Sequence, residues 1–139
     1  MMRRVWVLLL CAYLLGWVPL NFANELFATV PSLQMRGAPA IIELALHGMA
    51  AMLCATAGWM LWVGAPAGLT LAAAAVTAAG LVSLQSFFLT VLPRNTAPGE
   101  RIPLALVTCA HTAFWLAIIV RAARRERSRG QHDLANHPS

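Results

Sequence analysis

Two residues that can exchange a proton, Glu43 and His47, lie four positions apart in the apolar stretch IIELALHGMAAML at residues 41–53. Four residues turn an α-helix by about 400°, so the two side chains share one face. Histidine changes its charge between about pH 5 and pH 8, and a carboxylate beside it makes the two groups titrate as a pair. Such a pair could couple a proton to the binding of a cation, a lipid headgroup or a small amphiphile.

Polar side chains lie at similar depths in the other apolar segments. At 1.5 Å per residue, His47 and His111 lie about 10 Å and about 13 Å from the starts of their predicted helices. Gln85 lies about 10 Å before the end of its helix, while Asn21 and Glu25 lie about 24–30 Å into the first one. Because successive helices alternate in direction, all of these positions fall in the outer half of a membrane. We therefore predict an outward-facing polar pocket lined by Asn21, Glu25, Glu43, His47, Gln85, Ser86, Thr108 and His111.

Three interpretations of these polar residues remain open. The simplest is a structural accessory subunit whose polar groups only hydrogen-bond between helices. The second is the small-molecule or proton-coupled pocket, which is the leading specific hypothesis. The third is a haem- or metal-bearing redox subunit with His47 and His111 as ligands, completed by Glu43 or Glu25. The spacing of Glu43 and His47 differs from the Glu-x-x-His pairs of di-iron helices, so we expect no cofactor.

Other chemistry-bearing patterns are missing from the sequence. The three cysteines, Cys11, Cys54 and Cys109, are single and widely spaced, which predicts neither a disulfide framework nor a zinc site. We expect all three to be small, buried packing residues. The sequence has no glycine-rich phosphate loop, no G-x-S-x-G and no nucleophile–base pair, so no enzymatic activity is indicated.

Four apolar segments must position the polar residues. Hydrophobic residues make up 60% of the 139 and charged residues only 11%. The segments cover about 5–30, 40–63, 69–92 and 102–120, and each approaches the roughly 20 residues that span a bilayer as a helix. The predicted fold is therefore all-α, an integral-membrane four-helix bundle over residues 1–120. Residues 1–16 also resemble a signal peptide, but no small-x-small cleavage site follows, and we expect them to stay as the first helix.

Arginine placement predicts the orientation. Five of the ten arginines lie between Arg121 and Arg129, directly after the last apolar segment. With both termini inside, seven arginines flank the cytoplasmic side and three the outer side, which favours an N-in, C-in topology. We expect a multi-pass protein of the inner (plasma) membrane of a bacterial cell, with a basic, disordered cytoplasmic tail over residues 121–139. This charge is typical of a membrane flank, and no nucleic-acid partner is expected.

Small residues repeat every four positions on two of the predicted helices. Such repeats let helix backbones approach closely where no hydrophobic driving force exists between helices. They are Ala50, Cys54 and Gly58 on the second helix, and Ala75, Ala79 and Ser83 on the third. Four short helices packed this way leave little room for a transport channel within a single copy of the chain. The expected partners are therefore the lipid bilayer and a second copy of the chain or a larger membrane complex.

Overall fold

The computed structural model describes residues 2–88 and 98–136, and within these ranges the chain is helical with no strand. The first apolar segment is a continuous succession of short elements: α1 (Met2–Ala12), the π-helical turn η1 (Tyr13–Trp17), α2 (Val18–Thr29), the 3-10 turn η2 (Val30–Ser32) and α3 (Leu33–Arg36). The remaining elements are α4 (Ala38–Trp62), α5 (Gly68–Phe88), the 3-10 turn η3 (Pro98–Glu100) and α6 (Arg101–Asn136).

Four of the helical stretches are long and apolar enough to cross a membrane. They are Val5–Arg36, Ala38–Trp62, Gly68–Phe88 and Arg101–Arg125. The predicted all-helical fold with four long apolar helices is therefore confirmed. The expected end of the third helix, at residues 89–92, lies outside the described residues.

The last helix extends beyond the predicted fourth segment. α6 continues past Val120 to Asn136, into the predicted tail over residues 121–139, and residues 137–139 lie outside the described part. Extending an existing helix needs no new nucleus, and the alanine and arginine residues after Val120 are good helix formers. Charge content alone therefore did not reveal where the helix ends.

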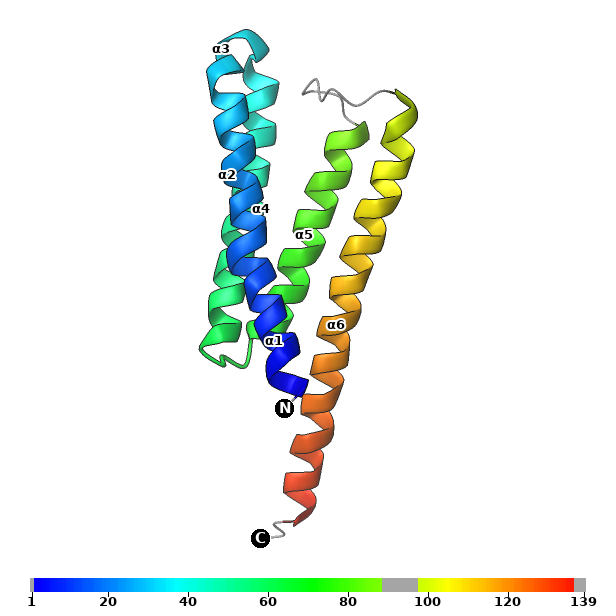
Figure 1. Ribbon diagram of the computed structural model, residues 1–139. Coiled ribbons are helices and arrows are strands. Elements are labelled where there is room, and N and C mark those ends of the chain that lie inside the picture. The colour runs from blue at the N-terminus through cyan, green and yellow to red at the C-terminus, as the bar shows by residue number, and fades with distance from the viewer. Residues whose placement is uncertain (1, 89–97, 137–139) are drawn as a thin grey trace.

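The helices form a bundle in which α5 packs against both α4 and α6. The first segment runs beside α4, and α1 also contacts α6. Figure 1 shows the two termini at the same end of the bundle, with the last turns of α6 extending beyond the other helices. An even number of passes across the bundle produces this arrangement.

Pro19 accounts for the irregular geometry of the first helix. It is the second residue of α2, the helix that follows the π-helical turn η1. A proline inside a helix lacks the N–H of the backbone ladder, and its ring clashes with the carbonyl four residues earlier. The wider π turn over Tyr13–Trp17 relieves this conflict, and such turns occur frequently at functional sites. Tyr13 is the first residue of this turn.

The tightly packed core lies in the half of the bundle that holds the termini. Its buried side chains come from all four long helices: Leu10, Cys11, Leu14, Cys54, Ala57, Leu61, Ala72, Ala75, Val76 and Ile119. The thiol of Cys11 donates to the Gly58 carbonyl at 3.7 Å, and that of Cys54 donates to the Ala75 carbonyl at 3.6 Å. The expectation of buried cysteines is confirmed for these two and wrong for Cys109, which is exposed on α6.

The predicted small-residue repeats do bring backbones together. Ala50, Cys54 and Gly58 are all buried on α4, and Ala75 is buried on α5. A Cβ added at Gly58 would lie 2.7 Å from Leu15 Cγ, so α4 contacts the first helix at that point with no space for a side chain. At Gly80 on α5, an added Cβ would lie 2.6 Å from the Oγ1 and 2.8 Å from the Cγ2 of Thr112 on α6.

We predict that Gly80→Ala destabilises the bundle by about 1–3 kcal/mol, because the new methyl group overlaps Thr112. The double variant Gly80→Ala/Thr112→Ala should recover most of the loss, since it removes both overlapping atoms. Gly16→Ala is the matched control, because its Cβ meets no described atom within 4 Å. Unfolding free energies of the purified protein in mixed micelles measure all three. Equal stability of Gly80→Ala and Gly16→Ala would contradict the close approach of α5 and α6.

Candidate functional site

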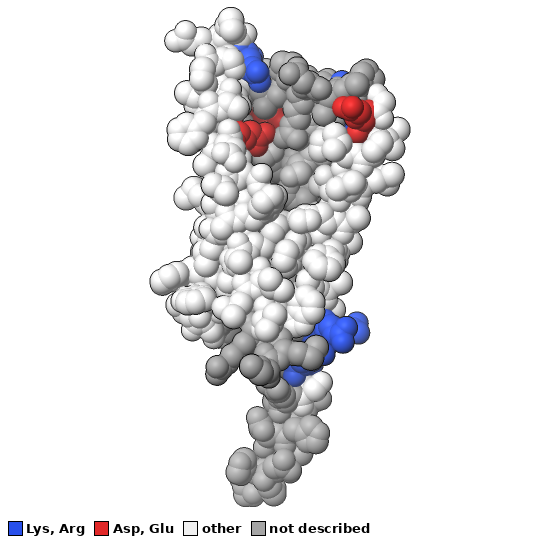
Figure 2. Space-filling view, in the orientation of Figure 1, with Lys and Arg blue, Asp and Glu red and all other residues white. Residues whose placement is uncertain are grey.

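A cleft of about 590 Å³ lies in the half of the bundle away from the termini, lined by residues of η1, α2, α4, α5 and α6. Figure 2 shows acidic side chains in this upper part of the molecule. Apolar side chains such as Val18, Phe22, Val82 and Val107 form much of its wall. Its polar and hydrogen-bonding members are Tyr13, Trp17, Asn21, Glu25, His47, Ser83, Thr108, His111 and Thr112.

The structure brings together five of the eight residues that we predicted for the pocket. Asn21, Glu25, His47 and His111 all line the cleft. Glu43 is buried beside the cleft and does not line it, and Gln85 is exposed on α5 away from it. Of the two hydroxyl residues in the predicted lining, Thr108 lines the cleft. Ser86 is buried and donates to the Ser83 carbonyl of its own helix.

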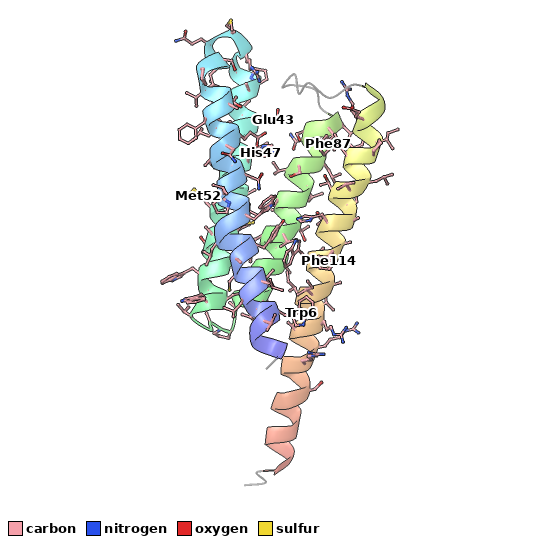
Figure 3. The ribbon with its side chains drawn as sticks, viewed as in Figure 1. Trp6, Glu43, His47, Met52, Phe87 and Phe114 are labelled. Atoms are coloured by element: carbon pink, nitrogen blue, oxygen red, sulfur yellow. The ribbon has the colours of Figure 1, made fainter. Side chains whose placement is uncertain are left out.

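His47 contacts both of the glutamates that precede it in the sequence, but in different ways. Figure 3 shows Glu43 and His47 one helical turn apart on α4. The His47 Nδ1 donates to the backbone carbonyl of Glu43 at 2.9 Å. Its Nε2 lies 3.8 Å from the Oε2 of Glu25, which comes from α2. The carboxylate that forms the ion pair with His47 is therefore that of Glu25, across the helix interface, whereas Glu43 contributes its main chain.

These contacts determine which nitrogen of His47 can exchange a proton. A carbonyl oxygen only accepts hydrogen bonds, so Nδ1 carries a hydrogen in both charge states. When the ring is neutral, Nε2 is an acceptor that faces a second acceptor, the Glu25 carboxylate. When Nε2 takes up a proton, the same geometry becomes an ion pair. The gap between Glu25 and His47 is therefore a place where one proton can be held or released.

A second polar pair involves Tyr13, which the sequence reasoning missed. The Nε2 of His111 on α6 lies 3.1 Å from the Tyr13 hydroxyl on η1. The Tyr13 ring stacks on Trp115, with centroids 4.3 Å apart and planes at 18°. Stacking restricts the tyrosine ring and keeps its hydroxyl beside the histidine. The available signal was that the chain's single tyrosine lies inside an apolar segment, close to a helix-distorting proline.

Several other polar side chains in the spans bond to their own helix. Asn21 Nδ2 donates to the Trp17 carbonyl at 2.9 Å, Thr108 Oγ1 to that of Leu104 at 2.9 Å, and Thr112 Oγ1 to that of Thr108 at 2.9 Å. Each bond spans four residues, as is usual for polar side chains in helices. In the described part of the chain, these three side chains make no hydrogen bond to another helix.

The described residues do not fit a metal site. In residues 2–88 and 98–136, no three His, Cys, Asp or Glu side chains form a group that could hold a metal ion. Of the histidine ring nitrogens, Nδ1 of His47 donates to the Glu43 carbonyl and Nε2 of His111 lies 3.1 Å from the Tyr13 hydroxyl.

Comparison with protein-family models, curated proteins and solved structures gives no match to this chain.

We predict that Tyr13 and His111 are energetically coupled. In a double-mutant cycle of Tyr13→Phe and His111→Ala, the coupling should be about 0.6 kcal/mol and no more than about 1.7 kcal/mol, the range of polar pairs between membrane helices. Combining Tyr13→Phe with His47→Ala is the control, and its effects should add. Unfolding free energies in mixed micelles provide the measurement. Additive effects of Tyr13→Phe and His111→Ala would show that the two side chains are not bonded.

We also predict that Glu25, and not Glu43, is the charge partner of His47. A double-mutant cycle of Glu25→Gln and His47→Gln should show a stabilising coupling of about 1 kcal/mol that weakens as the pH rises, because the ion pair exists only with a protonated imidazole. The matched cycle of Glu43→Gln and His47→Gln should show no such dependence on pH. The opposite assignment follows if the coupling appears in the Glu43 cycle instead.

Proposed function

We propose that this chain is a multi-pass protein of the inner (plasma) membrane, with four helices across the bilayer and both termini in the cytoplasm. Four helices have the length and composition to span, and the termini lie at one end of the bundle. In Figure 2 the charged side chains gather toward the two ends of the face, and the described surface between them is free of charge. Trp6, Trp59 and Trp62 are exposed near the end that holds the termini, as expected at a membrane interface.

We further propose that the protein binds a small organic molecule in the cleft and that binding is coupled to a proton at Glu25 and His47. The observation that carries this proposal is the pair itself, an imidazole 3.8 Å from a carboxylate on the wall of a cleft of about 590 Å³. With the proposed orientation the cleft lies toward the outer, non-cytoplasmic side.

The size and the lining of the cleft support a ligand of moderate size. Small-molecule sites occupy about 300–1,000 Å³ and combine apolar walls with a few polar groups that fix orientation. The cleft has both features. Ionisable residues inside membrane spans are costly, and they usually mark a site or a pathway. A bare proton or ion would need no such volume.

We predict that cysteines introduced at the two ends of the bundle react with a maleimide on opposite sides of the membrane. With the native cysteines replaced by alanine, Gln34→Cys on α3 and Ser128→Cys on α6 provide exposed reporters at the two ends. A membrane-impermeant maleimide added to intact cells should label residue 34, and residue 128 only after permeabilisation. The reverse pattern would contradict the orientation, and equal labelling of both would contradict the four-span arrangement.

We predict that gently extracted protein retains an organic adduct in native mass spectrometry. Glu25→Gln and His47→Gln should lose most of the adduct, because each removes one partner of the charged pair. Met52→Ala is the matched control: it changes a side chain on the same helix that is 73% exposed and points away from the cleft (Figure 3). A bare wild-type protein, or equal adduct occupancy in all the variants, would contradict the proposed binding role.

A further inference from the structure

The hydrogen-bonding groups of one cleft wall restrict the kind of ligand. On α2 and α4 the polar lining residues are Asn21, Glu25 and His47. The Asn21 amide nitrogen donates to the Trp17 carbonyl. Among the described residues, none donates a hydrogen bond to the Asn21 Oδ1. His47 donates through Nδ1 to Glu43, so its neutral ring presents Nε2 as an acceptor. Glu25 presents a carboxylate. In the neutral state of His47, this wall therefore offers mainly acceptors.

The distance between two of these acceptors indicates which group can bind between them. Glu25 Oε2 and His47 Nε2 are 3.8 Å apart, which is longer than a direct hydrogen bond. Two hydrogen-bond acceptors this close repel each other unless a hydrogen-bond donor lies between or beside them. A proton on Nε2 is one way to supply a donor, and an N–H group of a ligand is another.

The remaining lining residues of the cleft favour a cation with an apolar body. Tyr13, Trp17 and Phe22 line the same space, and the faces of aromatic rings attract ammonium groups. The Thr108 hydroxyl donates its hydrogen to the Leu104 carbonyl, so toward a ligand its oxygen acts as a hydrogen-bond acceptor. Ala50, Ala51, Val82 and Val107 leave room for hydrocarbon.

We propose that the cleft takes an organic ammonium ion that carries N–H donors, with the ammonium group held by Glu25 and the Nε2 of His47 and its apolar body among the aromatic and aliphatic walls. This inference rests on the proposed function, since it names the chemical class of the bound molecule. Because the ligand N–H and the proton on Nε2 occupy the same gap, they compete. Ammonium affinity should then fall as His47 becomes protonated.

Titratable groups face His47 from several elements. Glu25 faces His47 from α2, and Glu43 precedes it on α4. From η1 and α6, Tyr13 and His111 line the same cleft and bond to each other. The lining residues of α5 that the structure describes include no titratable side chain. Glu43→Gln and His111→Gln are therefore the control substitutions for a pH effect at His47.

The test compares four probes that share one apolar body: phenethylamine, phenethyltrimethylammonium, phenethyl alcohol and phenylacetate. Each is titrated by calorimetry into the full-length protein in nanodiscs, with empty nanodiscs as the blank. At about pH 8, phenethylamine should bind roughly tenfold or more tightly than the other three, because it alone combines charge with N–H donors. Its affinity should fall severalfold at about pH 5, and this change should disappear in His47→Gln and persist in Glu43→Gln and His111→Gln.

Variants separate the ligand class from the proposed function. Glu25→Gln should weaken phenethylamine roughly tenfold or more, while Met52→Ala leaves it unchanged, with unfolding midpoints confirming that both variants are folded. Equal affinity for the trimethylammonium probe, or no binding of phenethylamine, would overturn the proposed ammonium class. Tighter binding of the alcohol or of phenylacetate that still depends on Glu25 would overturn the class and leave the proposed function standing. Binding of every probe that is unaffected by Glu25→Gln would overturn both.

Discussion

The structure depends on close contact between helix backbones at a few small residues. Helices in an apolar surrounding gain little from burying further apolar surface, so packing must come from backbone approach and from polar contacts. Gly58 meets the first helix and Gly80 meets α6 without space for a side chain. The thiols of Cys11 and Cys54 donate to carbonyls of neighbouring helices, at Gly58 and Ala75. These contacts lie in the tightly packed half nearer the termini, whereas Gly80 and Thr112 line the cleft in the opposite half.

The cleft is lined by small residues as well as by larger ones. Ala50, Ala51, Ala79 and Gly80 lie beside bulkier apolar and polar side chains around about 590 Å³ of space. The polar groups are stabilised in two ways. Asn21 and Thr108 bond to their own helices, whereas His47 and His111 reach across to Glu25 and Tyr13. The first kind stabilises single helices, and the second joins different helices at groups that can gain or lose a proton.

Hydropathy and proline positions were sufficient to predict four long helices, because the length and composition of such a helix are local properties of the sequence. Pairing between helices is not local. Spacing suggested Glu43 as the partner of His47, but the Glu43 main chain binds Nδ1 and the charged partner is Glu25 on another helix. The importance of Tyr13 depends on a π turn before Pro19, and no simple periodicity predicts such a turn. Gln85 was predicted from its depth alone, but it lies on a face of α5 that does not line the cleft.

The central claim is that a proton and a ligand share the gap between Glu25 and His47. Counting protons tests it most directly, by calorimetric titration of phenethylamine near pH 5 in two buffers with different ionisation enthalpies. The account predicts the release of up to about one proton per ligand bound in the wild-type protein, and of almost none in His47→Gln. Binding without proton release, or with the same release in His47→Gln, would contradict it.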